Sequence, residues 1–197
     1  MNTILAMFTF SLIMSISPGP VNMIIVSSGI NNGFKKTFAF ISGATIGFTL
    51  LLAFIGLGFY KVVELFPNFL TYLAFFGSSF IIYMGYKIIT SIAPLDINDD
   101  NQKIPKFYEG FLLQWLNPKA WIASVSGISL FSSSEVILLT FISIYFFICY
   151  LGLSFWGILG DKISSFFRIE KRLKIFNIFM GSLLIVTALY LFYIQFI

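Results

Sequence analysis

Long apolar stretches with few charges recur along the whole chain. A helix that crosses the hydrocarbon core of a bilayer needs about 20 mostly apolar residues. Stretches of that length lie at residues 4–27, 38–59, 67–90, 110–130, 136–159 and 174–196. The connectors between them are short, the longest being residues 91–109 and 160–173, so no soluble domain fits. The pattern predicts an all-α membrane protein with six transmembrane helices in a single domain, residues 1–197.

The composition agrees with a membrane protein. Of the 197 residues, 58% are hydrophobic and 10% are charged, and the mean hydropathy is +0.96. Soluble globular domains carry about 25% charged residues. The first residues, MNTILAMFTF, contain neither a basic leader nor a small-residue cleavage site. We therefore expect them to begin the first span rather than to form a removable signal peptide.

The basic residues predict the orientation of the chain, because lysine and arginine beside spanning helices stay preferentially on the cytoplasmic side. Lys119 lies inside the fourth span, and Lys61 follows the second. The other ten basic residues flank the connectors after the first, third and fifth spans: Lys35, Lys36, Lys87, Lys103, Lys106, Lys162, Arg168, Lys171, Arg172 and Lys174. Both termini are therefore expected outside the cell.

Six spans in this orientation divide into two halves of three helices, approximately residues 1–95 and 96–197. Because three is an odd number, the second half enters the membrane in the opposite sense to the first. This is the arrangement of an inverted repeat, which is typical of secondary transporters.

Two of the predicted spans contain proline. The first has Pro18, Gly19 and Pro20 within an otherwise apolar sequence, and the fourth has Pro118 beside Asn117. Proline removes a backbone donor, and its ring clashes with the carbonyl one turn earlier. We therefore expect the first and fourth helices, which correspond to each other in the two halves, to be broken within the bilayer.

Polar residues accompany both breaks. Ser15, Pro18 and Asn22 follow the three-and-four spacing of one helix face, and Gln114 and Ser124 flank the second break. Two polar stripes at similar depth predict a shared wet cavity that binds a small solute. The candidate binding residues are Ser15, Pro18, Gly19, Pro20, Asn22, Gln114, Asn117, Pro118, Lys119 and Ser124.

Lys119 is a formal charge inside a span, which costs about 2.5–3.5 kcal/mol on insertion scales. Two arrangements would compensate for this cost. The long stem could carry the ammonium to the cytoplasmic boundary. Alternatively, the ammonium faces the cavity, where a substrate carboxylate or the free carbonyls of the broken helices stabilise it and where it could exchange a proton during transport.

Small residues elsewhere are interpreted as packing positions. Gly43 and Gly47 lie one turn apart in the second span, and such small-residue stripes let helices approach closely. Cys149 lies alone in the fifth span, so the chain cannot form an internal disulfide. We interpret it as a small apolar packing residue.

Several functional classes are disfavoured. The chain has no histidine, so no serine–histidine pair can form, and its carboxylates lie in connectors or at span edges. We therefore expect no catalytic site, no cofactor and no metal site. The basic residues flank the membrane rather than form a nucleic-acid-binding face. Soft-metal transport favours several Cys, His or Met at ligand spacing, whereas the six Met are scattered.

The motifs resemble those of a known family. They are SPGPVN at residues 17–22, GATIG at 43–47, YMGYKI at 83–88 and EGFLLQWLNPKAW at 109–121. In these the chain resembles the lysine exporter and homoserine/threonine resistance (LysE/RhtB) superfamily of bacterial amino-acid exporters. The resemblance implies a multi-pass protein of the bacterial cytoplasmic (inner) membrane that exports an amino acid or a derivative by proton-coupled antiport. A metal-cation exporter of the same superfamily is the alternative.

One position departs from the family. Many relatives carry an aspartate after the second glycine of the second helix, where this chain has Phe48. If that carboxylate binds a cation or couples protons in the relatives, this chain either lacks that function or performs it with another residue. The segments SSGINNGFKK and YMGYKIITS are most similar to the branch that exports cysteine and O-acetylserine. The sequence leaves open the substrate and whether the chain forms a homo-oligomer.

Overall fold

The computed structural model describes residues 2–59, 69–90, 104–167 and 169–196, and within these residues the regular structure is entirely helical. The all-α prediction is confirmed. In chain order the elements are α1 (Asn2–Ile16), α2 (Pro20–Asn32), α3 (Phe34–Phe54), η1 (Ile55–Phe59), α5 (Phe69–Ile89), α6 (Phe107–Trp115), α7 (Pro118–Phe131), α8 (Glu135–Ile163), η2 (Ser164–Phe167) and α9 (Glu170–Phe196).

Four helical segments of the described chain are long and apolar enough to cross a membrane: Phe34–Gly58, Thr71–Ile89, Glu135–Phe167 and Glu170–Tyr190. The pair formed by α1 and α2, bent by 60°, adds a fifth if the two count as one broken span. The expected fourth span is instead divided into α6 and α7, which have 9 and 14 residues. The six-span inverted repeat therefore stays a prediction.

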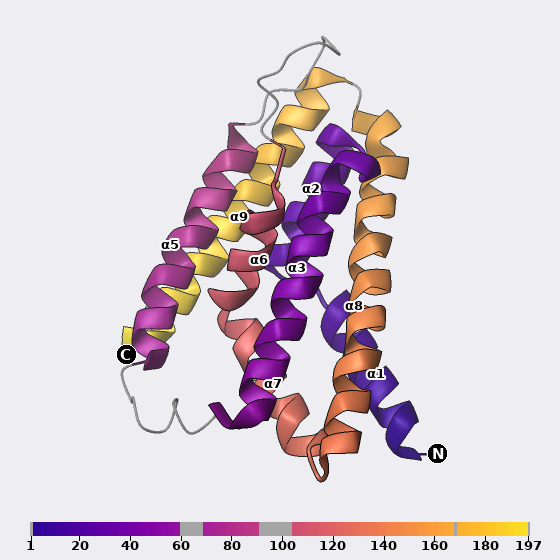
Figure 1. Cartoon of the computed structure of the whole chain (residues 1–197). Coiled ribbons are helices and arrows are strands. Elements are labelled where there is room, and N and C mark those ends of the chain that lie inside the picture. Colours follow the sequence, from indigo (N-terminus) through magenta and orange to yellow (C-terminus); the bar gives the residue numbers. More distant parts are fainter. Residues whose placement is uncertain (1, 60–68, 91–103, 168, 197) are drawn as a thin grey trace.

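The helices form an elongated bundle (Figure 1). Helix α5 packs along α9, α6 packs along α3, and α8 contacts α1, α2 and α3. The turn between α2 and α3 and the η2 segment lie at the upper end of the figure, whereas both chain termini lie toward the lower end. The upper end is called the basic end, because α3 begins with Lys35 and Lys36 there and α9 begins with Lys171 and Arg172.

At the opposite end, aromatic rings fill the space between helices. Phe10 of α1 lies 6.0 Å from Phe131 of α7 and 5.9 Å from Phe141 of α8, measured between ring centroids. Phe131 and Phe141 lie 4.8 Å apart. Phe141 is fully buried. These three residues, called the aromatic cluster, close the lower end of the bundle by apolar contact.

Gly43 and Gly47 of α3 face α6. A Cβ atom on Gly47 would lie 2.9 Å from the carbonyl oxygen of Phe111, and one on Gly43 would overlap the backbone of Phe107. A larger side chain at either position would therefore push α3 and α6 apart. The two glycines thus set the distance between α3 and α6.

Gly47→Leu should destabilise the bundle. Overpacking of this kind costs about 1–3 kcal/mol, which corresponds to a fall of about 5 °C in the thermal unfolding temperature of a chain of this size. Unfolding of the purified protein in detergent measures the shift. Leu50→Phe, an enlargement at a half-exposed position of the same helix, is the control and should change the unfolding temperature little. Equal shifts in the two variants would contradict close packing at Gly47.

Candidate functional site

The first break lies between α1 and α2, as the proline motif predicted. Helix α1 ends at Ile16 and α2 begins at Pro20, with Gly19 in extended conformation between them. The last carbonyls of a helix lack partners in the helix itself. Here the Asn22 side-chain amide donates to the carbonyl oxygens of Ser15 at 2.9 Å and Ser17 at 3.2 Å. Asn22 is therefore both a lining residue of the site and the clamp that holds the end of α1.

The second break lies between α6 and α7, also as predicted. Helix α6 ends at Trp115, and Pro118 is the first residue of α7. The Asn117 side-chain oxygen accepts a hydrogen bond from the backbone N–H of Lys119 at 3.1 Å. Asparagine before a first-turn proline is a strong helix-start signal. The asparagine–proline–lysine sequence thus starts a new helix in the middle of the bundle.

Lys119 joins the two breaks. Its ammonium donates to the carbonyl oxygen of Ser17 at 2.8 Å, to the Ser17 hydroxyl at 2.8 Å and to the carbonyl oxygen of Pro18 at 3.2 Å. Of the two arrangements expected from the sequence, the structure has the one in which free carbonyls stabilise the charge. Among the described residues no carboxylate pairs with Lys119. Its positive charge is therefore balanced by the dipoles of carbonyl and hydroxyl groups rather than by a described carboxylate.

A small cavity that opens toward solvent lies between the breaks. Six of the ten predicted site residues line it: Gly19, Pro20, Asn22, Gln114, Asn117 and Lys119. The first turns of α2 and of α7 thus both contribute to its wall. Helix N-termini carry partial positive charge, so two such termini and one ammonium face the same space.

The other four predicted residues are not part of the cavity lining. Ser15 and Pro18 act through their carbonyl oxygens, which accept from Asn22 and Lys119. Pro118 is half-buried, at the start of α7. The Ser124 side chain is fully buried, and its hydroxyl has no hydrogen-bond partner among the described residues.

Sequence reasoning missed the wall that α3 and α8 provide. Phe48, Tyr145, Cys149 and Leu153 line the cavity, and the rings of Phe48 and Tyr145 stack with centroids 4.4 Å apart. Cys149 had been interpreted as a packing residue; it is buried and also part of the wall. Phe48 had been noted only as the position where many relatives carry an aspartate. None of the four residues carries a charge or lies at a helix break, so the apolar pattern alone could not distinguish them from other buried residues.

Ser17 was also missed as a direct partner of Lys119. It lies within the SPGPVN segment, so the motif was the signal that could have identified it. The serine supplies both a carbonyl and a hydroxyl to the ammonium.

Comparison with known proteins agrees with this architecture. The sequence profile of the LysE type translocators matches residues 12–195. The chain belongs to this family. The family and the helices that are long and apolar enough to cross a membrane indicate a multi-pass membrane transport protein of the LysE type.

The relatives of this LysE-type chain share its full length. The cysteine/O-acetylserine efflux protein of Escherichia coli (strain K12) is 26% identical over 198 residues, which cover 95% of this chain and 96% of the relative. The protein of the same name from Shigella flexneri serotype 5b is 25% identical with the same coverage. No solved structure matches the chain significantly. The metal-exporter alternative gains no support from the family match or from these relatives.

Proposed function

We propose that this LysE-type chain is a secondary transporter of the bacterial inner membrane that exports an amino acid or an amino-acid derivative from the cytoplasm by proton-coupled antiport. The observation that carries the proposal is the Lys119 ammonium, which lies between two broken helices and lines the cavity, and whose partners among the described residues are carbonyl and hydroxyl oxygens. The efflux proteins named above support the choice of an amino-acid-like solute.

The α-carboxylate of the solute binds at Lys119 and at the first residues of α2 and α7. The partial positive charge at the two helix N-termini favours negative charge there. This contribution comes from the helix dipole, because Pro20 and Pro118 have no N–H and the N–H of Lys119 is bonded to Asn117. The α-ammonium needs hydrogen-bond acceptors. When the carboxylate takes Lys119, the carbonyl oxygens of Ser17 and Pro18 lose their donor and become acceptors for it. A zwitterion thus finds partners for both charges without an intramembrane carboxylate.

The transport cycle uses the inverted repeat. In such a repeat α1 corresponds to α6, α3 to α8 and α5 to α9. The contact of α1 with α8 then corresponds to the contact of α6 with α3, and the α5–α9 contact corresponds to itself. These pairings support two opposed halves that rock around the cavity at their interface. The basic end is the cytoplasmic face, with both termini outside.

Proton coupling falls to Lys119, the charged side chain among the described residues that line the cavity. Binding of a proton from outside and its release inside would alternate Lys119 between the ammonium and the neutral amine. In proteoliposomes, an inward proton gradient should accelerate efflux of preloaded O-acetylserine several-fold, and a protonophore should remove the acceleration. If efflux does not respond to the proton gradient while exchange of the solute is retained, proton coupling is ruled out but transport is not.

A resistance panel tests the function in cells. An expressing strain should survive raised concentrations of toxic amino acids or derivatives, whereas cells carrying the Lys119→Met variant should not. Cadmium salts in the same panel report on metal export and should show no protection. Protection against cadmium alone would overturn the proposal.

A further inference from the structure

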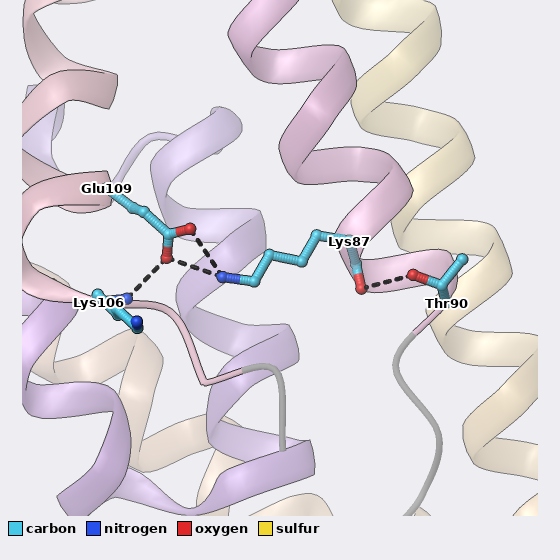
Figure 2. Close-up of polar contacts among 4 residues, drawn as sticks. All are labelled: Lys87, Thr90, Lys106 and Glu109. Carbon is cyan, nitrogen blue, oxygen red and sulfur yellow. Dashed lines mark hydrogen bonds and ion pairs between the residues drawn. The ribbon is translucent and has the colours of Figure 1, made fainter. Parts of the chain in front are cut away.

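A buried ion pair lies outside the cavity between the breaks. The Lys87 ammonium at the end of α5 donates to both carboxylate oxygens of Glu109 in α6, at 2.7 and 2.9 Å (Figure 2). The backbone N–H of Lys106 donates to the same carboxylate at 2.7 Å. The Glu109 side chain is 2% exposed and that of Lys87 is 14% exposed. The pair joins the two sequence halves at the basic end.

A second cavity adjoins this ion pair. Lys87 and Pro105 form part of its wall, whereas Glu109 is not among its lining residues and is linked to it through the ion pair with Lys87. The rest of the polar wall comes from one helix, α2: Ser27, Ser28, Asn31 and Asn32. Its wall, with a charged residue on one side and amides and hydroxyls on the other, offers partners to a small charged solute once α5 and α6 move apart.

Helix α2 connects the two cavities. Its first turn, up to Asn22, lines the cavity between the breaks, and its later turns from Ile24 onward line the second cavity. At 1.5 Å per residue, Ser27 lies roughly 7 Å further toward the basic end than Asn22. A solute that enters from the basic end along α2 therefore meets the second cavity first.

The links around the second cavity differ in how easily a solute could replace them. Asn31 and Asn177 exchange two hydrogen bonds of 2.9 and 3.0 Å between α2 and α9, and Ser28 bonds Thr37 at 2.7 Å between α2 and α3. These neutral pairs can hydrogen-bond to a zwitterion but carry no charge opposite to either of its ends. The Lys87–Glu109 pair has one charge of each sign, complementary to a carboxylate and an ammonium.

We infer that the second cavity is a vestibular binding site for the zwitterionic solute, whose carboxylate takes Lys87 and whose ammonium takes Glu109 as α5 and α6 separate. This inference rests on the proposed export function. Separating a buried ion pair leaves two charges without partners, which is strongly unfavourable. A zwitterion replaces both partners, and a solute with a single charge replaces only one. A ligand drives opening only if it binds the open state more tightly than the closed state. The zwitterion does so because it pairs with both of the separated charges.

A purely structural role for Glu109 makes a different prediction. Glu109 is the third residue of α6 and caps its first turn through the Lys106 N–H. Glutamine performs the same capping function without charge, and capping does not require Lys87. The double variant Lys87→Met/Glu109→Gln therefore removes the charges, leaves no unpaired ion and keeps the cap.

The test compares transport from the two faces of the membrane. Initial rates of O-acetylserine uptake are measured in everted and right-side-out membrane vesicles that contain the wild type, the double variant or Glu109→Gln alone. The single variant provides a second measurement if the double variant accumulates poorly. Lys162→Met and Glu170→Gln, which remove exposed charges of the same types at the basic end, are the controls.

The vestibular site predicts a one-sided effect. In both ion-pair variants the KM at the basic-end face should rise by about tenfold or more, whereas the KM at the opposite face should stay within about twofold, as it should at both faces in the controls. A KM that is unchanged at both faces, or raised equally at both, overturns the inference and leaves the export function standing. Absence of wild-type uptake from either face would contradict the proposed function instead.

Discussion

Lys119→Met should reduce amino-acid exchange in proteoliposomes by about a hundredfold or more. The ammonium is the charged group at the wall of the cavity, and each hydrogen bond to a charged group contributes about 1.5–3 kcal/mol. Loss of two such bonds to a carboxylate corresponds to at least two factors of ten in affinity, since about 1.4 kcal/mol is one factor of ten. Methionine has a similar length and no charge, so it leaves the helix break intact.

Exchange is measured as counterflow of radiolabelled O-acetylserine into preloaded vesicles. Lys162→Met is the matched control, because it removes an exposed lysine from the end of α8 far from the cavity. Its counterflow should equal that of the wild type. Retention of wild-type counterflow by the Lys119 variant would mean that the carboxylate binds elsewhere.

Gly19→Leu should lower counterflow by about thirtyfold. A Cβ atom at Gly19 would lie 3.1 Å from the Lys119 ammonium nitrogen and 3.3 Å from its Cδ. A flexible lysine tip can move a few tenths of an ångström for a methyl group, but a leucine side chain fills the space that the ammonium occupies and displaces it by an ångström or more. Displacement of a positioning group by about 1 Å can lower the rate by on the order of a hundredfold.

Comparison of Gly19→Ala with Gly19→Leu separates the effect of side-chain size from any effect on the backbone. The φ angle of Gly19 is −171°, which any residue can adopt, so neither variant strains the backbone. The alanine variant should lose about threefold or less, because the displacement needed is small. Equal, large losses in both variants would indicate that the chain at the break, rather than the position of Lys119, limits transport.

The helix breaks could be predicted because their cause is local. Pro18, Pro20 and Pro118 each remove a backbone donor wherever they stand, and Asn117 before Pro118 is a start signal that acts within one turn. The six lining residues that the sequence identified all lie at these two breaks. Local chemistry therefore located the site.

The contacts across the site could not be predicted, because they depend on how distant helices pack. Nothing in the sequence near Lys119 specifies that its ammonium reaches Ser17, more than a hundred residues earlier. Phe48 and Tyr145 form the opposite wall only because α3 and α8 pack side by side. Their aromatic side chains follow the same apolar pattern as the lipid-facing ones.

The charged groups at the span edges illustrate the same limit. Lys87 served in the sequence as an orientation signal and as part of the YMGYKI motif, and Glu109 as the first residue of another motif. Their partnership arises where the end of α5 meets the start of α6. A pattern of charges along the chain gives the membrane boundary, but it does not give the pairs that form there.

The central claim is that the cavity between the breaks binds the carboxylate of the solute. The decisive measurement is counterflow of labelled O-acetylserine by purified wild-type protein, with unlabelled serine and serinamide compared as preloaded exchange partners. Serine should drive exchange, and serinamide, which keeps the ammonium but lacks the carboxylate, should drive it at least about tenfold less well. No counterflow of the labelled solute with serine inside, or equal exchange with the amide, would contradict the account.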